Sequence, residues 1–227
     1  PDLSSLHLCP WDPTIAFVYA DLFFEGAPYD VCPRQILKRQ IRAAAEAGYR
    51  FLAGMEPEFI VMEYDSNGQP AKAIDDDPPA GGGLRPKRQA FGYDVEYTLD
   101  SMPYLAEMSR HIEALGWELK NVVCEGGYSQ FELDFGYTDL LAMADRFTFL
   151  RIMAKEVAKQ HGMFATFMPK PAQGDWRNGA HINWSVQALD RPGENLFEAD
   201  GDWSELALQA VAGVIRHGVA ITAVNCS

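Results

Sequence analysis

The 227-residue chain is short of basic residues: 19 lysines and arginines stand against 32 aspartates and glutamates, a formal net charge of -13. Phosphate backbones are bound by clustered Lys and Arg, so this balance argues against a nucleic acid partner. Cysteines are also few, and Cys9, Cys32, Cys124 and Cys226 show no CxxC spacing. Neither a disulfide framework nor a structural zinc site is indicated, and we expect a reducing, cytoplasmic compartment.

Long apolar runs and the common nucleotide-binding glycine motifs are absent as well. No stretch has the apolar length of a transmembrane helix, and the N-terminus has no signal pattern, so no membrane partner is expected. Neither GxGxxG nor a Walker A sequence occurs. The composition, 48% hydrophobic and 22% charged, is that of a globular protein with ample core. Both ends read as cut, so we expect a piece of a longer protein.

Hydrophobic periodicity and turn residues predict alternating helices and strands. Helices are expected from Pro33 to Gly48, from Asp100 to Gly116, from Thr138 or Asp139 to Gln160, and over 203–217. Strands are expected over 14–24 (buried), 49–64, 93–99, 117–124, 129–135, 163–168 and 180–186. Residues 71–89 are expected to form a mobile loop. This order predicts an α+β fold with a largely antiparallel, curved sheet and flanking helices.

The stretch 54–62 places two glutamates in an otherwise apolar, strand-like run. Side chains alternate along a strand, so Glu56 and Glu58 share one face, whereas Phe59 and Val61 share the other. Burying ionised carboxylates is costly unless cations or hydrogen-bond donors meet them. Either this is an edge strand with a solvated glutamate face, or a hard divalent cation such as Mg2+ or Mn2+ compensates the charge.

Three further residues of metal-ligand type lie on strand-like segments. Glu125 and Glu132 stand at the two ends of a hairpin-like segment, and His181 shares a strand face with Asn183 and Ser185. A single histidine is more often a core or surface residue than a ligand. Together with Glu56 and Glu58, however, the set favours an oxygen-rich dinuclear site for Mg2+ or Mn2+ with ATP, whose phosphates two cations can neutralise. The ligand balance disfavours zinc.

Five sequence blocks carry a resemblance to a known family. They are Glu56–Phe59, Glu125–Glu132, Ala144–Arg146, Ala165–Pro171 and Gly179–Ser185. In order and spacing these blocks resemble the glutamine synthetase family. The segments Cys124–Gly127 and Tyr93–Tyr97 are most similar to its branch of γ-glutamylmethylamide synthetases and type III-like enzymes.

The resemblance implies an ATP- and Mg2+-dependent ligase. In that family the γ-carboxylate of glutamate attacks ATP, and ammonia or a small amine then displaces phosphate from γ-glutamyl phosphate. The implied ligands are Glu58, Glu125 and Glu132 for a first metal and Glu56 and His181 for a second. Glutamate is implied to lie against Glu58, Gly179 and His181, and ATP against Asn183 and Ser185.

The resemblance also implies parts that this sequence does not contain. A β-grasp domain would precede Pro1, whereas catalytic arginines, a flap glutamate and a last metal-binding glutamate would follow Ser227. We therefore expect residues 1–227 to be part of one catalytic domain of a homo-oligomer, a dodecamer by resemblance. The catalytic residues themselves stay unassigned.

The sequence departs from the family pattern at Arg177, where small residues usually precede the histidine. Arg177 could clash with the usual substrate pose or contact a different carboxylate. This leaves open an inactive, metal-binding paralogue with a regulatory or structural role, and a ligase for a larger amine such as a polyamine. A guanidino-type kinase is a further alternative, which the five-ligand set disfavours. A milder departure is Ser129, where glycine is common.

Overall fold

The computed structural model describes residues 1–72, 92–127, 129–171 and 176–225. The chain forms two compact units. The first contains Pro1–Tyr19, Gly54–Gly136 and Ala144–Ile182, and the second contains Ala20–Ala53, Tyr137–Met143 and Asn183–Ser227. The loop expected over 71–89 lies outside the described residues, except for Ala71 and Lys72.

The sheet is organised around one long strand, β5 (Tyr49–Tyr64), whose bounds agree with the prediction. Along the main path the strand order is β10-β5-β8-β7, and β6, β9 and β11 also pair with β5. The other strands of this sheet are β6 (Pro70–Lys72), β7 (Leu119–Cys124), β8 (Gln130–Phe135), β9 (Thr138–Asp139), β10 (Phe164–Thr166) and β11 (Ala180–Ala188). The registered pairs of β5 with β6, β8, β9 and β10 are antiparallel, as is β7 with β8. The expected α+β fold with a largely antiparallel sheet is confirmed.

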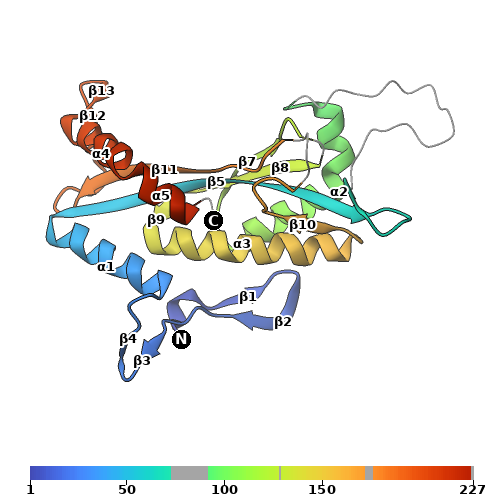
Figure 1. The fold of residues 1–227 in the computed structure, drawn as a ribbon, viewed down its shortest axis with the longest axis horizontal. Helices are drawn as coiled ribbons and strands as arrows, with labels where there is room; N and C mark the ends of the chain where they lie inside the picture. Colours follow the sequence, from blue (N-terminus) through green and yellow to red (C-terminus); the bar gives the residue numbers. More distant parts are fainter. Residues whose placement is uncertain (73–91, 128, 172–175, 226–227) are drawn as a thin grey trace. The chain divides into compact units, whose positions relative to one another are not determined.

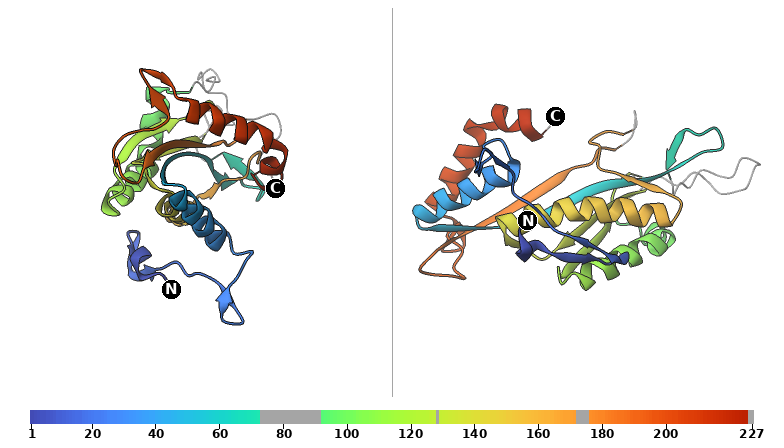
Figure 2. Two further views of the ribbon diagram at one scale, coloured as in Figure 1. Left: turned by 90° about the vertical axis from the view of Figure 1, so that its left-hand side faces the viewer. Right: turned by 90° about the horizontal axis from the view of Figure 1, so that it is seen from below.

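Two helices, α2 (Val95–Ala114) and α3 (Leu140–Gln160), supply the core of the first unit. Figures 1 and 2 show α3 lying along one face of the sheet. Phe59, fully buried on β5, packs its ring 6.3 Å from Tyr104 of α2. The Tyr104 hydroxyl donates a hydrogen bond to the Ala154 carbonyl of α3 at 3.1 Å, so both helices are tied to the sheet's apolar face.

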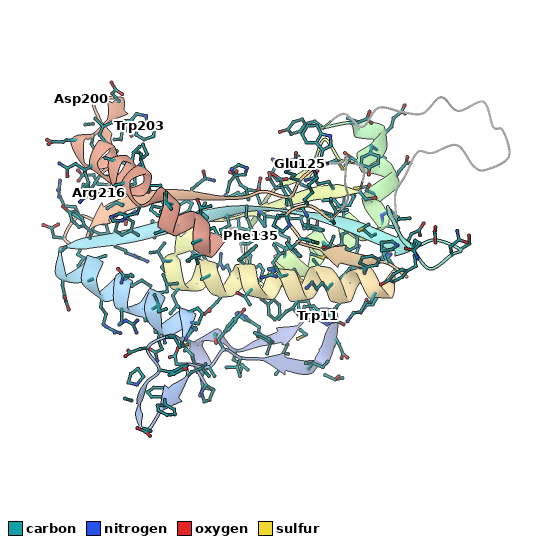
Figure 3. The ribbon with its side chains drawn as sticks, viewed as in Figure 1. Trp11, Glu125, Phe135, Asp200, Trp203 and Arg216 are labelled. Carbon is teal, nitrogen blue, oxygen red and sulfur yellow. The ribbon has the colours of Figure 1, made fainter. Side chains whose placement is uncertain are left out.

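The start of the chain differs from the prediction. A short 3-10 helix, η1 (Leu3–Ser5), leads into a two-stranded ribbon, β1 (His7–Cys9) with β2 (Asp12–Phe17). Trp11 (Figure 3) and Phe17 place their rings 5.3 and 5.1 Å from Phe149 of α3. The buried strand expected over 14–24 is wrong, because β2 ends at Phe17 and the next strand, β3 (Phe23–Phe24), is exposed. Aromatic and β-branched residues gave a strand signal, but a ribbon with one partner strand leaves much of it uncovered.

The second unit contains α1 (Pro33–Glu46), α4 (Glu205–Arg216) and α5 (Gly218–Asn225). It also contains the exposed two-stranded pairs β3 with β4 (Ala27–Pro28) and β12 (Glu198–Ala199) with β13 (Asp202–Trp203). Asp21 anchors the first turns of α1 by accepting hydrogen bonds from Arg34 and Lys38 at 2.7 and 2.5 Å. Among the described residues, no single helix is long and apolar enough to span a membrane, although α4 and α5, bent by 66°, reach that length and apolarity as a pair.

The strand expected over 93–99 is wrong, since α2 already begins at Val95. Tyr93, Val95 and Tyr97 alternate with polar residues and so mimic a strand. Asp94 decides the local structure instead, because its side chain accepts a hydrogen bond from the Tyr97 backbone N–H at 2.9 Å and caps the helix. Glu96 in the first turn adds a favourable interaction with the helix dipole.

Replacing this cap tests the corrected helix start. We expect Asp94→Ala to lower the free energy of unfolding by about 1 kcal/mol, the usual cost of removing an N-cap side chain. Asp100→Ala is the matched control, because Asp100 lies inside α2, where alanine is the better helix former. Chemical denaturation of both variants measures the difference. A larger loss in Asp100→Ala than in Asp94→Ala would instead support a helix that starts at Asp100.

Candidate active site

The register between β5 and β8 brings two of the predicted glutamates together. Glu58 is directly opposite Glu132 in this antiparallel pair, and the next pairs are Phe59 with Phe131 and Ile60 with Gln130. Side chains of directly opposed residues lie on the same face of a sheet, so the two carboxylates are neighbours. Glu132 is only 9% exposed, whereas Glu56 and Glu58 are half-buried. The fully solvated glutamate face is therefore not what the structure shows.

The predicted hairpin between β7 and β8 positions Glu125. Glu125, labelled in Figure 3, follows the last residue of β7. Its backbone N–H donates to the Gln130 carbonyl at 2.9 Å. The turn is closed by a second hydrogen bond, from the Gln130 N–H to the Gly127 carbonyl at 3.2 Å. Ser129 adopts the left-handed backbone region, with φ 56°, which glycine occupies without strain. This explains why glycine suits the position.

β11 brings His181 to the same carboxylates. Its Nε2 lies 3.8 Å from Glu58 Oε1, and its side chain is 65% exposed. Just before the strand, the Gly179 carbonyl accepts a hydrogen bond from the Glu58 N–H at 3.1 Å. A Cβ at Gly179 would lie 2.8 Å from Glu58 Oε1 and 3.3 Å from His181 Nε2. Only glycine therefore leaves room for this approach.

The carboxylates of this cluster destabilise one another's ionised forms. Burial, followed by the negative charges of Asp134, Glu125, Glu56 and Glu58, raises the pKa of Glu132 to about 7. Burial and the charge of Glu58 also raise the pKa of Glu125. Such shifts report that negative charge is crowded into a poorly solvated place, which is typical of a site built for cations.

Asp134 is a member of the cluster that the sequence interpretation missed. Burial and the charges of Glu56 and Glu125 raise its pKa to about 6, against a hydrogen bond from Asn121. Its Oδ1 is buried without a hydrogen-bond partner in the described part of the chain. The available signal was the period of two from Glu132 to Asp134, the same pattern that linked Glu56 to Glu58.

The structure also limits the prediction of a metal site. Within the described ranges, no three His, Cys, Asp or Glu side chains are arranged so that they could hold a metal ion. The acids are neighbours on adjoining strands rather than a closed coordination shell. Their chemistry nevertheless fits a hard divalent cation, because carboxylate oxygens are its preferred ligands and ion binding would relieve their repulsion.

Asn183 and Ser185 lie further along β11, in the second unit. Asn183 is exposed and Ser185 is half-buried, and their alternation places both side chains on one face of the strand. Their assignment to ATP stays a prediction.

Comparison with known proteins identifies the family. A family model described as "Glutamine synthetase, catalytic domain" matches residues 30–227, so this chain belongs to the glutamine synthetase family. The resemblance inferred from the five sequence blocks is confirmed.

The curated relatives include two kinds of ligase. The glutamine synthetase of Rhizobium meliloti (strain 1021) is 33% identical over 230 residues, which cover 99% of this chain and 49% of the relative. The glutamate–methylamine ligase of Methyloversatilis universalis (strain FAM5) is 31% identical over 230 residues, with the same coverage of both chains. The chain thus spans about half the length of the curated relatives it matches.

Solved structures agree on the fold. A structure titled "GmaS/ADP complex-Conformation 1" matches 98% of this chain and 49% of its own chain, at 33% identity and a TM-score of 0.87. A structure titled as a novel glutamine synthase homolog matches 96% of this chain and 48% of its own, at 26% identity and a TM-score of 0.77.

The close approach at Gly179 can be tested without removing any carboxylate. We expect Gly179→Ala to weaken Mn2+ binding by about tenfold or more, because the added Cβ displaces Glu58 or His181 from the cluster. Gly213→Ala on α4 is the matched control, since a Cβ there meets nothing within 4 Å. Isothermal titration of the full-length protein with Mn2+ measures both, and equal affinities would remove Gly179 from the site.

Proposed function

We propose that this chain is part of the catalytic domain of an ATP-dependent ligase that joins the γ-carboxylate of glutamate to ammonia or a small amine through γ-glutamyl phosphate. The observation that carries the proposal is the carboxylate cluster on β5 and β8, found in a chain of the glutamine synthetase family. Phosphoryl transfer needs positioning and neutralisation of charge rather than a protein nucleophile, which suits a site made of carboxylates.

The proposed ligands are the ones that the family resemblance implies, and three of them, Glu58, Glu132 and Glu125, belong to the cluster described above. Glu58, Glu125 and Glu132 would hold one divalent cation, and Glu56 and His181 a second. When bound, Mg2+ or Mn2+ would neutralise the phosphates of ATP and orient the transferring group. We further propose Asn183 and Ser185 as contacts for ATP.

The chain's own residues set the positions of these ligands. The Gln130 side-chain amide donates to Glu58 Oε2 at 2.8 Å, which holds that carboxylate with its other oxygen on the side of Gly179 and His181. The near-complete burial of Glu132 keeps bulk water from one side of the cluster. We propose that glutamate lies against Glu58, Gly179 and His181, with its γ-carboxylate turned toward the site of the cations.

The relatives narrow the acceptor amine to two candidates but do not decide between them. Relatives named glutamine synthetase and glutamate–methylamine ligase are of similar identity to this chain, so ammonia and methylamine are both candidates. A larger amine such as a polyamine remains the second candidate acceptor. Assembly into a homo-oligomer and a cytoplasmic location are part of the same proposal.

The first experiment measures phosphate release by the full-length protein with Mg2+, ATP and glutamate. Ammonia, methylamine, ethylamine and putrescine are compared as acceptors. We expect release to depend on glutamate and to be fastest with one amine. Binding of Mn2+ without phosphate release with any amine would favour an inactive, metal-binding paralogue, and restored release in Arg177→Gly would then assign the defect to Arg177.

The roles of the ligands predict large losses of activity. We expect Glu132→Ala and His181→Ala each to lower the rate of product formation at least about 100-fold, on the order of 3 kcal/mol of barrier, because each removes a metal contact. Glu63→Ala is the control, since Glu63 is an exposed glutamate at the outer end of the same strand. Wild-type rates in both ligand variants would refute the metal-site assignment.

A further inference from the structure

The segment before β11 is fixed to the carboxylate cluster by Gln130. The Gln130 Nε2 donates to the Arg177 carbonyl at 2.8 Å and to Asn178 Oδ1 at 3.2 Å, in addition to its bond to Glu58. Gln130 thus joins the main chain at 177–178 to a predicted metal ligand. The backbone at Arg177 is therefore held beside the carboxylate cluster.

Asn178 fixes the same segment from its other side. Its Nδ2 donates to the Met168 carbonyl at 2.9 Å and to the Thr166 carbonyl at 3.3 Å, and its N–H donates to the Pro169 carbonyl at 2.9 Å. Trp176 lies two residues before this hydrogen-bonded asparagine.

The Trp176 indole lies against the backbone of the turn between β7 and β8. A Cβ at Gly126 would stand 2.7–2.9 Å from three carbons of the indole, and a Cβ at Gly127 would stand 3.1 Å from the Trp176 Cβ. The absence of a side chain at Gly126 makes room for the indole, whereas a Cβ at Gly127 would first meet Gln130 Oε1, at 2.5 Å. Trp176 is nevertheless 58% exposed, so a large aromatic surface borders the turn that begins with Glu125.

An aromatic ring beside ionised carboxylates is the combination that recognises an organic ammonium group. The negative face of the indole attracts the cation, and the carboxylates supply countercharge. The apolar ring also tolerates the methyl or methylene groups of an alkylammonium ion, whereas a carboxylate alone would select for a small inorganic cation.

We propose that Trp176 is a specificity-determining residue whose indole forms one wall of a pocket for an alkylammonium group next to Glu125. The proposal deepens the proposed function and rests on it. Two parts of that reaction carry the required chemistry, namely the α-ammonium group of the amino acid substrate and the protonated form of an acceptor amine. The experiment separates these two sources.

The test uses Trp176→Leu and Trp176→Phe in the full-length protein. Leucine keeps an apolar side chain over the glycines but lacks the aromatic face, whereas phenylalanine keeps part of it. We expect Trp176→Leu to raise the KM for one ammonium ligand about 5- to 30-fold, the equivalent of about 1–2 kcal/mol of cation–π attraction, and Trp176→Phe to raise it less. The KM for ATP and the Kd for Mn2+ should stay within about twofold. Trp203→Leu, at an exposed tryptophan of β13, is the control and should leave all constants unchanged.

Each outcome decides the proposal. A raised KM for glutamate alone assigns the pocket to the amino acid, and a raised KM for the amine alone assigns it to the acceptor. Unchanged values for both, or an equal rise in the KM for ATP, would overturn the role of Trp176. Should the full-length protein bind Mn2+ but release no phosphate, the proposed ligase activity fails on its own. Calorimetric titration of the Mn2+-loaded protein with glutamate and with methylammonium then tests the pocket, and equal affinities in wild type and Trp176→Leu for both would refute it.

Discussion

The mutual repulsion of carboxylates held by the register of β5 and β8 is the constraint on which the rest of the site depends. Pairing Glu58 with Glu132 forces two acids onto one face of the sheet, while Phe59 and Phe131 are buried on the other. A slip of one residue would exchange these faces, so the apolar core also fixes the position of the charges. The energy that folds the sheet thereby holds an unfavourable group of like charges together. The pKa of Glu132, raised first by burial and then by the neighbouring charges, reflects that cost.

The sequence predicted those features whose physical signal is local. The period of two along β5, the stop at Gly48 and the long amphipathic pattern of α3 each lie within one element, and the structure has them where expected. The start of α2 was misplaced because the alternation of Tyr93, Val95 and Tyr97 outweighed one capping aspartate in the sequence pattern. The composition of the N-terminal strand could not predict whether it is buried, because the side chains that would bury a strand come from distant parts of the chain.

In the candidate site, too, local signals were predicted and contacts between distant residues were not. Glu58, Glu132 and His181 were identified one by one, as residues of metal-ligand type on apolar strands, and the structure brings them together. Asp134 was missed although its spacing of two from Glu132 was a local signal, because the charges of Glu56 and Glu125 that make it a member of the cluster come from other strands. The contact of Trp176 with Gly126 joins residues 50 positions apart. Two consecutive glycines in a sequence do not indicate which aromatic side chain packs on them.

The hydrogen-bond acceptors around the side-chain amide of Gln130 outnumber the hydrogens that this amide can donate. Its Nε2 carries two, yet three acceptors lie within hydrogen-bond distance: Glu58 Oε2, the Arg177 carbonyl and Asn178 Oδ1. The two hydrogens therefore cannot serve the three acceptors one to one: either one hydrogen is shared, or one acceptor is left without it. The side-chain amide of Gln130 thereby links Glu58 to a segment more than 100 positions later in the chain, so three partners of the site share one amide group.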